Sequence, residues 1–434
     1  MRKMKNSGIE WIGEIPESWD VVSFQQATER MATGLNPRDN FVLTAEDEFY
    51  YVTIRNFKNG KLFLDENCDK ISVEAFNIIQ ERSQLQKGDI LFASISENGS
   101  AYIIEEDPKN WNINESVFTI RPNAQRMIAK YFYYHLINVG YYSDLRNDAT
   151  GATFQSIKQN KLRKSRIVMP SLLEQTRISD YLDKKCAEID AIIAAKEKTN
   201  ELLKERRQSI IYEAVTKGLD PTVPMKDSGI EWIGEIPESW DCQKIKYAFT
   251  LQAGATPKSG NEEYWDGDIV WITPADYTTE DVYIYAGHKT ITDEGLNSCA
   301  TTIIPEGSII FSKRAPIGLV AINKVPLCTN QGCISCIPNK DVDSKFYYYV
   351  MSAFTKEFDL FGSGTTFKEI SAEAFANFVL PYTVIEEQKE IAAYLDLKCQ
   401  EINDLISSNN STIEKLKEYR QSAIYEAVTG KVEI

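Results

Sequence analysis

Hydrophobic residues recur in two segments of the chain with the spacing of a long helix. The first segment runs from Gln175 to Lys217, and the second lies near the C-terminus. The apolar positions are Leu182, Ile189, Ile193, Leu203 and Ile210 in the first segment and Leu395, Ile402, Ile406, Ile413 and Leu416 in the second. Because residues at heptad spacing fall on one line along a helix, both segments are predicted to be α-helical, and the first would be about 65 Å long. A helix of this length needs a partner along its apolar line, so we predict that the two helices pair with each other.

Polar residues interrupt both apolar lines at mid-length. They are Lys196, Thr199 and Asn200 in the first segment and residues 407–410 in the second. If the two helices pair antiparallel, these polar segments face each other, and a buried polar layer fixes the register of the pair. Simple exposure of these residues to solvent explains the pattern equally well.

A capping pattern precedes each predicted helix. Ser171 stands three residues before Glu174, and Thr383 stands three residues before Glu386. At this spacing the two side chains can satisfy free backbone N–H groups of the first turn reciprocally. We therefore expect Ser171 with Glu174 and Thr383 with Glu386 to cap the two helices.

Outside these helices the pattern changes to short apolar runs. Examples are FYYVTI, DILFASI and DIVWITP, which are rich in β-branched and aromatic residues. Gly, Pro, Asn and Asp separate such runs, as is typical of short strands joined by turns. The strand-rich segments extend roughly over residues 21–169 and 242–380, so we predict two compact domains of mixed, β-rich structure.

The whole pattern occurs twice in the chain. The sequence SGIEWIGEIPESWD at Ser7–Asp20 returns letter for letter at Ser228–Asp241. Looser matches follow in the same order, pairing TGLNPR with AGATPK, KGDILFAS with EGSIIFSK, INESVFTI with TNQGCISC, TGATFQSI with SGTTFKEI, and QSIIYEAVT with QSAIYEAVT. Duplication of a whole unit explains this order.

The predicted fold is therefore α+β with an internal pseudo-two-fold repeat. Two β-rich domains are separated by two long helices that form an antiparallel coiled coil. We expect the first domain at 1–170, the first long helix and linker at 171–220, the second domain at 221–382 and the second long helix at 383–434.

Composition and length agree with a globular protein of the cytoplasm. The chain is 43% hydrophobic and 26% charged, which suits packed domains, and 434 residues allow about two or three of them. The N-terminal sequence MRKMKNSGIEW has no apolar segment like that of a signal peptide, and no stretch approaches the ~20 apolar residues of a membrane span. Eight cysteines without the dense spacing of a secreted scaffold fit a reducing compartment.

The net charge of −15 at first argues against a nucleic-acid partner, because phosphate binding depends on Lys and Arg. The positive charges are unevenly placed, however. The segment KQNKLRKSR contains Lys158, Lys161, Arg163, Lys164 and Arg166. It is either a basic patch that binds phosphates or a solvated loop or strand edge.

Signatures of catalysis are missing from the sequence. His135 and His288 are the only histidines, and neither has a histidine at the equivalent position of the other copy, so we expect both to be structural. Neither a GxxxxGK[ST] phosphate loop nor a GxGxxG after a predicted strand occurs. A nucleotide triphosphatase and a dinucleotide enzyme are therefore not supported.

Three cysteines, Cys328, Cys333 and Cys336, have a C-x4-C-x2-C spacing that resembles some iron–sulfur proteins. In the other copy the positions of Cys333 and Cys336 are taken by Val117 and Ile120, which belong to a predicted strand. Burial as small hydrophobic residues explains the cysteines without a metal. A metal or redox protein that uses them remains an alternative.

Several motifs together resemble the specificity subunit of type I restriction-modification systems. They are IEWIGEIPESW in both copies, GATPKSG, IVWITPAD, SGTTFKEIS and the helix start PYTVIEEQKEIAAYL. They occur in the family's order and span essentially the whole chain. The first copy departs from the pattern, with VTIRNFKNG where the second has WITPADYTT, and with the looser helix start LLEQTRISDYL.

The resemblance implies a DNA-binding, non-catalytic subunit. Each domain would be a target-recognition domain that reads one half of a bipartite, asymmetric site in double-stranded DNA. The two helices would be the central and distal conserved spacers that set the distance between the half-sites. Two modification subunits would dock and methylate adenine, and restriction subunits with translocase and nuclease activity would join them. No metal or cofactor is expected on this chain, and S-adenosylmethionine, ATP and magnesium would bind the partners. The alternative is a coiled-coil scaffold that does not read DNA.

Exposed polar and basic residues in loops are the expected DNA contacts, because amide and basic side chains read base edges and hold phosphates. In the first domain we select Arg38, Arg55, Asn56, Ser96, Asn98, Thr153, Gln155, Lys158, Lys161 and Arg163. In the second domain we select Thr256, Lys258, Thr273, Asp276, Lys313, Arg314, Thr366 and Lys368. Each is nearly as well explained as a turn or cap residue.

The repeated tryptophans are the candidates for partner docking. They are Trp11, Trp19, Trp232 and Trp240, all within the identical segment. A two-fold complex needs the same docking surface twice, which would explain the identity. Anchoring of the segment against the domain core explains it equally well.

Overall fold

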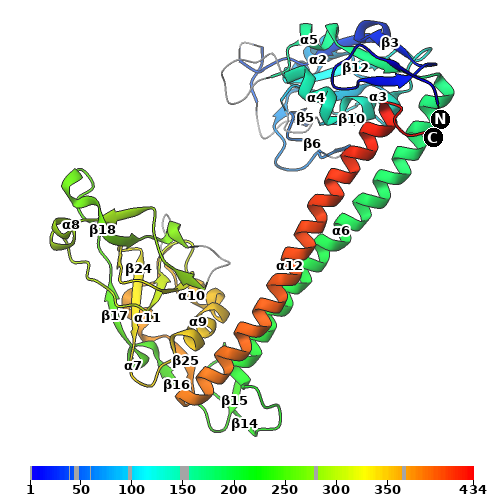
Figure 1. The fold of residues 1–434 in the computed structure, drawn as a ribbon. Coiled ribbons are helices and arrows are strands. Elements are labelled where there is room, and N and C mark those ends of the chain that lie inside the picture. The colour runs from blue at the N-terminus through cyan, green and yellow to red at the C-terminus, as the bar shows by residue number, and fades with distance from the viewer. Residues whose placement is uncertain are drawn as a thin grey trace. The chain divides into compact units, whose positions relative to one another are not determined.

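The computed structural model of the chain describes residues 2–38, 40–43, 48–58, 60–95, 100–146, 156–277, 282–363 and 368–434 (Figure 1). These residues form two compact units. The first comprises Met1–Lys196 and Asn410–Ile434, and the second comprises Glu197–Asn409. Each unit contains a β-rich domain and one half of each long helix, which confirms the predicted duplicated α+β architecture.

The two long helices are α6 (Leu172–Lys217) and α12 (Ile385–Val428). Within each unit they run antiparallel, as predicted, because the N-terminal half of one lies beside the C-terminal half of the other (Figure 1). The apolar positions predicted from the heptad spacing are buried or half-buried. No helix among the described residues, these two included, is long and apolar enough to cross a membrane.

The polar residues at mid-length follow both predicted alternatives: Thr199, Ser407, Ser408 and Asn410 are exposed, whereas Asn200 and Asn409 form a polar contact between the two helices. Asn409 Nδ2 donates to Asn200 Oδ1 at 2.9 Å, and Asn200 is buried. A shift of either helix along the other would leave these amides without their partner, so the pair favours a single register.

Arginines at equivalent positions of the repeat also cross the helix pair. Arg420 Nε lies 3.1 Å from Asp190 Oδ1 in the first unit, and Arg207 Nη1 donates to Asn403 Oδ1 at 2.6 Å in the second. The same lateral contact therefore holds the two helices together in both units.

The first domain contains an antiparallel sheet in the order β10-β9-β12-β4 and a three-stranded sheet in the order β11-β5-β8. In the second sheet β11 is parallel to β5, and β8 is antiparallel to β5. The strands of these sheets are β4 (Thr28–Thr33), β5 (Phe49–Val52), β8 (Lys70–Ile71), β9 (Ile90–Ala93), β10 (Ala101–Ile103), β11 (Trp111–Ile113) and β12 (Val117–Pro122). Two-stranded pairs join β1 (Met4–Asn6) to β2 (Glu14–Pro16), β3 (Asp20–Ser23) to β13 (Arg166–Met169), and β6 (Phe57–Lys58) to β7 (Lys61–Leu62). The short helices are α1 (Phe24–Ala27), α2 (Val73–Ser83), α3 (Ala129–Leu136), α4 (Val139–Arg146) and α5 (Gln159–Lys164).

The second domain repeats this plan with one more strand in its larger sheet, whose order is β17-β24-β21-β22-β19. Its smaller sheet, β20-β18-β23, again has one parallel and one antiparallel pair. The strands are β17 (Phe249–Ala253), β18 (Trp265–Ile272), β19 (Tyr283–Ile284), β20 (Lys289–Ile291), β21 (Ile309–Ser312), β22 (Val320–Asn323), β23 (Cys328–Thr329) and β24 (Cys333–Pro338). The pairs are β14 (Met225–Asp227) with β15 (Glu235–Pro237), and β16 (Asp241–Lys244) with β25 (Val379–Tyr382). Helices are α7 (Ile245–Ala248), α8 (Asp293–Asn297), α9 (Ser344–Ala353), α10 (Thr355–Leu360) and α11 (Ala372–Asn377), with 3-10 turns η1 (Glu262–Tyr264) and η2 (Pro274–Asp276).

The main core of each unit lies between the larger sheet, the short helices and the long helices. In the first unit Phe92 and Phe132 belong to the same buried cluster as Leu182 of α6. In the second unit Phe311 and Phe346 belong to the cluster of Leu395 of α12. Each domain is thus packed onto the start of the long helix that follows it in the chain.

Two equivalent glycines allow the two sheets of each domain to approach closely. A Cβ atom on Gly34, after β4, would lie 1.6 Å from the Ile113 carbonyl oxygen. A Cβ atom on Gly254, after β17, would lie 2.2 Å from the Asn330 carbonyl oxygen. Any other residue would push the two backbones apart, so the loop that follows each glycine depends on this close contact.

We expect Gly254→Ala to lower the free energy of unfolding by about 1–3 kcal/mol, because overpacking against backbone cannot be relieved by a side-chain rotation. Gly260→Ala is the matched control, since a Cβ atom there meets nothing within 4 Å, and its effect should stay within about 0.5 kcal/mol. Urea unfolding followed by tryptophan fluorescence measures both. Equal unfolding midpoints for the two variants would show that the close approach does not constrain the fold.

Candidate nucleic-acid interface

Three of the eight DNA-contact candidates of the second domain lie around the turn Asn330–Gly332, between β23 and β24. The Thr256 hydroxyl donates to Gln331 Oε1, and Lys313 N donates to the Gly332 carbonyl oxygen at 2.9 Å. Asn330 N donates at 2.9 Å to the carbonyl of the residue that precedes Thr273. We call this set the loop end of the second domain; it comprises residues 254–258, 273–276, 313–314, 330–332 and 368–370.

Glu369 holds two of the cationic candidates in place. Its carboxylate lies 2.7 Å from Lys313 Nζ and 2.7 Å from Arg314 Nε. Burial alone would raise the pKa of Glu369, but the hydrogen bonds and charges of Lys313 and Arg314 outweigh it and keep the pKa below its usual value. Lys368 pairs with Asp359 at 2.6 Å next to this group. The cations are thereby positioned at the loop end, and the Arg314 side chain keeps 43% of its surface exposed.

Asp276 and Asn56, which are equivalent in the repeat, both close a turn. Asp276 Oδ2 accepts hydrogen bonds from Thr273 N and Oγ1, both at 2.7 Å, and Asn56 Oδ1 accepts from Thr53 N and Oγ1 at 2.7 and 2.9 Å. Asp276 Oδ1 also accepts from His288 N at 2.7 Å, and only 2% of its side chain is exposed. Burial raises the pKa of Asp276, but these hydrogen bonds outweigh it and lower the pKa overall. Much of the hydrogen-bonding capacity of both side chains is therefore used within the fold.

The remaining candidates of the described chain are mostly exposed. Arg55 is 81% exposed and lies 3.8 Å from Asp69. The other exposed side chains are Arg38, Lys158, Arg163 and Lys258, whereas Thr256 and Lys161 are half-buried. The short helix α5 carries Lys161, Arg163 and Lys164, and Arg166 begins strand β13, so most of the basic segment is helical and its end lies on a strand. The candidates Ser96, Asn98, Thr153, Gln155 and Thr366 lie outside the described residues.

The first domain repeats the hydrogen bonds of this loop end. Ser94 N donates to the Ser116 carbonyl oxygen at 2.9 Å, as Lys313 N does to Gly332, and Ile157 N donates to the Ser94 carbonyl oxygen at 2.8 Å. The equivalent bond in the second domain joins Ile370 N to the Lys313 carbonyl oxygen at 3.0 Å. The loop end of the first domain comprises residues 34–38, 53–56, 94, 114–116 and 157.

Sequence reasoning missed the two groups that organise the loop end of the second domain. Glu369 and the turn Asn330–Gly332 were noticed only as parts of the repeats SGTTFKEI and TNQGCISC. For Glu369 an available signal was its position directly after Lys368, which was selected as a DNA contact; the turn Asn330–Gly332 is far in sequence from every selected residue.

Two of the tryptophans proposed for partner docking lie at the starts of the long helices. Trp19 Nε1 donates to Glu174 Oε1 at 3.2 Å, and Trp240 Nε1 donates to Glu387 Oε2 at 2.9 Å. Both indoles are buried. These contacts are those of an anchor between the repeated segment and the helix; docking of a partner by the tryptophans stays a prediction.

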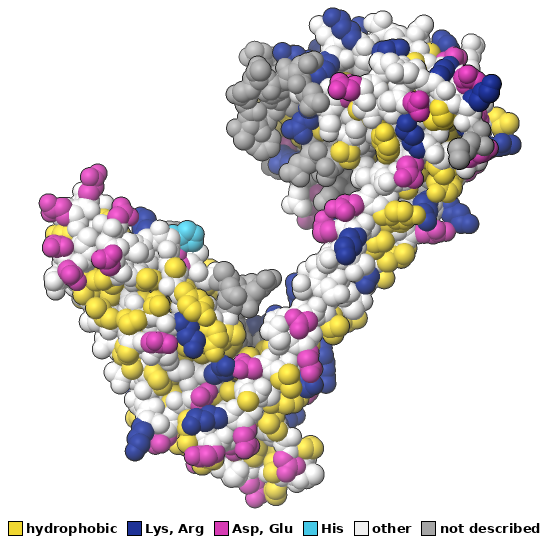
Figure 2. Space-filling model, viewed as in Figure 1, with side chains coloured by type: hydrophobic (Ala, Val, Ile, Leu, Met, Phe, Trp, Pro, Cys, Tyr) yellow, Lys and Arg dark blue, Asp and Glu magenta, His cyan; other side chains and the backbone are white. Residues whose placement is uncertain are grey.

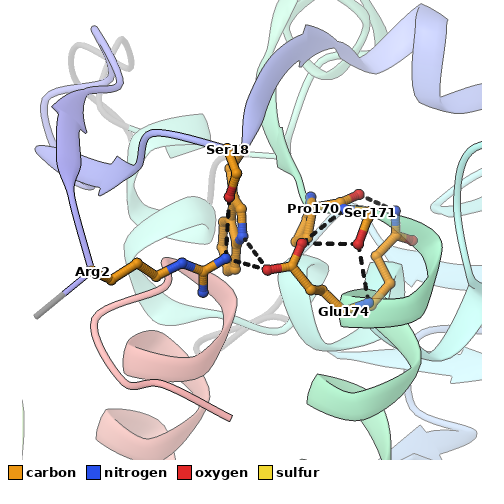
Figure 3. Close-up of polar contacts among 7 residues, drawn as sticks. Arg2, Ser18, Pro170, Ser171 and Glu174 are labelled. Atoms are coloured by element: carbon orange, nitrogen blue, oxygen red, sulfur yellow. Dashed lines mark hydrogen bonds and ion pairs between the residues drawn. The ribbon is translucent and has the colours of Figure 1, made fainter.

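Glu174 links three parts of the first unit (Figure 3). It accepts a hydrogen bond from the Ser171 hydroxyl at 2.9 Å, contacts Arg2, and accepts a second hydrogen bond from the Trp19 indole N–H at 3.2 Å. Ser171 Oγ in turn accepts from Glu174 N at 3.3 Å, which confirms the predicted cap of α6. Burial alone would raise the pKa of Glu174, but the hydrogen bonds from Ser171, Trp19 and Arg2 outweigh it and lower the pKa.

The predicted partner of Thr383 was wrong. The Thr383 hydroxyl donates to Glu387 and not to Glu386. In the repeat Glu387 is the equivalent of Glu174, and Val384 is the equivalent of Ser171. Valine has no hydroxyl, so Val384 cannot make the hydrogen bonds of Ser171. At the start of α12 the side-chain contact therefore joins Thr383 to the glutamate four residues later.

Trp11 and Trp232 are half-buried in aromatic surroundings. Trp11 packs between His135, at 6.1 Å between ring centroids, and Tyr425 of α12, at 6.3 Å. Trp232 stacks on Phe378 at 5.1 Å. Burial lowers the pKa of His135 to about 3, so this histidine is neutral in the folded protein, in line with a structural role.

The three closely spaced cysteines point into three different clusters of buried residues. Cys328 packs with Trp271, Cys333 packs with Ile310, and Cys336 belongs to the main core of the second unit. Burial raises the pKa of Cys328 to about 11 and that of Cys333 to about 12. Among the described residues, no group of three or more His, Cys, Asp or Glu side chains is arranged to hold a metal ion.

Acidic side chains gather on the part of the second unit formed by β18 and α8 (Figure 2). The carboxylates of this region are Glu262, Glu263, Asp266, Asp268, Asp293 and Glu294. The negative net charge is thus partly concentrated in one region. Lys313 and Arg314 carry two positive charges against the one negative charge of Glu369, so one positive charge remains at the loop end and can attract phosphate despite the acidic sum.

The chain is similar to DNA specificity proteins of type I restriction systems. The family model described as "Type I restriction modification DNA specificity domain" matches residues 16–204 and again residues 237–415. The MjaIX specificity subunit of Methanocaldococcus jannaschii is 39% identical over 193 residues, which cover 42% of this chain and 43% of that subunit. A putative MjaX specificity subunit of the same organism is 27% identical over 433 residues, covering 98% of this chain and 96% of the relative.

Two solved structures share the fold. A chain from a study of complex assembly and conformational transition of the type I R-M system has a TM-score of 0.72 at 17% identity, covering 96% of this chain and 99% of that one. The HsdS subunit from Thermoanaerobacter tengcongensis has a TM-score of 0.52 at 16% identity, covering 96% and 98%. At this identity the likeness concerns the fold alone, and it confirms the predicted arrangement of two β-rich domains and two long helices.

We expect Glu387→Ala to destabilise the first turn of α12 by about 1–2 kcal/mol, because the Trp240 indole and the Thr383 hydroxyl lose their acceptor. Glu386→Ala is the control, since Glu386 is exposed and its removal should change stability by less than about 0.5 kcal/mol. Hydrogen exchange of the peptide covering residues 380–395 distinguishes the two. Equal exchange rates in both variants would contradict the role of Glu387.

Cys328, Cys333 and Cys336 should resist N-ethylmaleimide in the native protein, because only an accessible thiolate reacts. Cys299, which is half-buried, is the internal control and should be modified faster. Mass spectrometry of the peptides measures the modification at each site, and all of them should react after denaturation. Rapid labelling of the three buried thiols without denaturant would contradict their placement in the core.

Proposed function

The chain belongs to the family of type I restriction modification DNA specificity proteins, and from this we propose that each of its two β-rich domains reads one half of a bipartite, asymmetric DNA site. Residues 1–170 and 221–382 would be the target-recognition domains, and residues 171–220 and 383–434 the helical spacers. The chain itself performs no chemistry. Adenine methylation and DNA cleavage belong to partner subunits.

The observation that carries this proposal is a shared backbone frame with different side chains. The hydrogen bonds from Ser94 N and Lys313 N place the loops of both domains in the same way. The side chains on this frame differ, as with Ser94 and Lys313 themselves. Two surfaces of equal shape and unequal chemistry suit an asymmetric site whose halves have different sequences.

Lys313 and Arg314 are the best candidates for phosphate contacts in the second domain. Their pairing with Glu369 keeps both cations in fixed positions before DNA arrives. Phosphate contacts of this kind set the register of a protein on the duplex, and neighbouring side chains then read the bases. Half-sites on one face of B-DNA would lie about 10 bp apart, and the helical spacers would set this distance.

The outer faces of the long helices are proposed to dock two modification subunits. Hydrophobic side chains lie exposed along these helices (Figure 2). Tyr181 and Ile192 on α6 are exposed, and so are Tyr394 and Leu405 at the equivalent positions of α12. A partner that binds twice needs such a surface twice, and exposed apolar residues at matching positions provide it.

Expression of the chain with the modification subunit of its own system tests the proposal, in a host without adenine methylation. Sequencing that detects N6-methyladenine should find a split motif, with two short specified parts around a gap of fixed length. Methylation should depend on both subunits, so either one alone is the control. An assembled complex that methylates no split motif would contradict DNA reading and would favour the scaffold alternative.

A further inference from the structure

A tight turn at the loop end of each domain is closed by the same side chain. Asn330 Oδ1 accepts a hydrogen bond from Gly332 N at 2.8 Å, and Asn114 Oδ1 accepts one from Ser116 N at 3.0 Å. This is an Asx turn, in which the asparagine side chain fixes the backbone of the two following residues. The residue in the middle of the turn is then held on the outside. It is Gln331 in the second domain and Glu115 in the first.

Each turn is also tied to both sheets of its domain. Asn330 N donates to the Ile272 carbonyl oxygen of β18, and Asn114 N donates to the Val52 carbonyl oxygen of β5, both at 2.9 Å. On the other side, Gly332 and Ser116 accept the hydrogen bonds from the ends of β21 and β9 described above. A side chain in the middle of such a turn is carried by a rigid support, which is what base recognition requires.

Gln331 and Glu115 are exposed, and one polar atom of each is held by the domain. The Thr256 hydroxyl donates to Gln331 Oε1. The Tyr51 hydroxyl lies 3.4 Å from Glu115 Oε2 and shares its proton with the nearer Leu35 carbonyl oxygen at 2.5 Å. Within the described parts of the chain, no further hydrogen bond engages Gln331 Nε2 or Glu115 Oε1. The Gln331 side chain is therefore oriented from one end, the Glu115 carboxylate is contacted at one end, and both retain hydrogen-bonding capacity at the other.

The chemistry of the two side chains differs in the way that distinguishes bases. A glutamine amide can accept from adenine N6 and donate to adenine N7 in the major groove. A glutamate carboxylate can only accept, and cytosine N4 is the donor that suits it. The backbone of Lys313 lies beside the turn, because Lys313 N is bonded to the Gly332 carbonyl oxygen, so the cationic side chains of Lys313 and Arg314 start from a segment next to Gln331. Phosphates held there would bring base edges within reach of the turn.

We propose that Gln331 and Glu115 are equivalent base-reading residues of the two domains, Gln331 reading an adenine and Glu115 a cytosine. This inference rests on the proposed function, namely that the two domains read DNA. It goes further in assigning one base of each half-site to one position of the fold.

The test exchanges the two residue types in the full-length chain, expressed with its modification subunit, and sequences N6-methyladenine. Gln331→Glu should change one specified position of one half-site, from adenine towards cytosine, and leave the other half-site unchanged. Glu115→Gln should make the opposite change in the other half-site. The unchanged half of each motif reports that the protein is folded and assembled. Glu306→Gln, at an exposed position in the turn before β21, is the control for a change of charge and should leave the motif as it is.

Gln331→Ala keeps the test decisive if the charged variant methylates poorly. Discrimination at one position should fall by about 5- to 150-fold, which corresponds to the loss of one bidentate base contact. If the unchanged protein methylates a split motif and all three variants at positions 331 and 115 keep it, the inference is overturned. It is also overturned if Gln331→Ala assembles but methylates nothing, because a residue that reads one base is not needed for the rest of the site. Absence of any split motif with the unchanged protein would instead contradict the proposed function itself.

Discussion

The antiparallel pairing of α6 and α12 is the constraint on which the rest of the structure depends. Neither helix can bury its apolar line alone, and each domain in turn packs onto the helix that follows it. Tyr134 donates to Asp183 Oδ1 at 2.8 Å, and the equivalent Tyr349 donates to Asp396 Oδ1 at 2.8 Å. The same hydrogen bond thus connects each domain to the long helix that follows it. This contact helps to fix the orientation of each domain, and of its loop end, relative to that helix.

The duplicated segments divide by physical role. The letter-for-letter repeat contains β2 in one copy and β15 in the other, which pair with the strands just before it, and it places Trp19 and Trp240 on the glutamates of the first helical turns. Such packing tolerates few substitutions, because a buried indole must keep both its cavity and its acceptor. The loop ends instead share backbone hydrogen bonds, which do not depend on the side chain. Their surfaces can therefore change while the scaffold stays the same.

The sequence predicted the parts of the fold that depend on periodicity and repetition. The heptad lines and the duplicated β-rich domains follow from spacing and repetition, and the structure confirms them. For the polar residues at mid-length the sequence left burial and exposure equally open, and the structure shows both, with Asn200 buried and Thr199 exposed. The cap at Thr383 was misassigned because spacing alone gave Glu386, whereas comparison with Glu174 in the other copy points to Glu387.

The candidate interface was less predictable, because its geometry comes from residues far apart in the chain. The contact of Thr256 with Gln331 and that of Arg314 with Glu369 join loops that no local pattern relates. Residue type marked Asp276 and Asn56 as candidates, but only the fold shows that their side chains close turns. A side chain that could contact a DNA base is distinguished from a structural one by its exposure and its free hydrogen-bonding capacity, and not by residue type alone.

The discontinuity of the first unit has a consequence for biosynthesis. The second unit is one continuous segment, Glu197–Asn409, whereas the first unit needs Asn410–Ile434 to cover the apolar line of its half of α6. On the ribosome the second unit can therefore be completed before the first, although its residues are made later than most of those of the first. Until the final segment emerges, the nascent first unit exposes a hydrophobic helix face, the kind of surface that chaperones bind and that promotes aggregation.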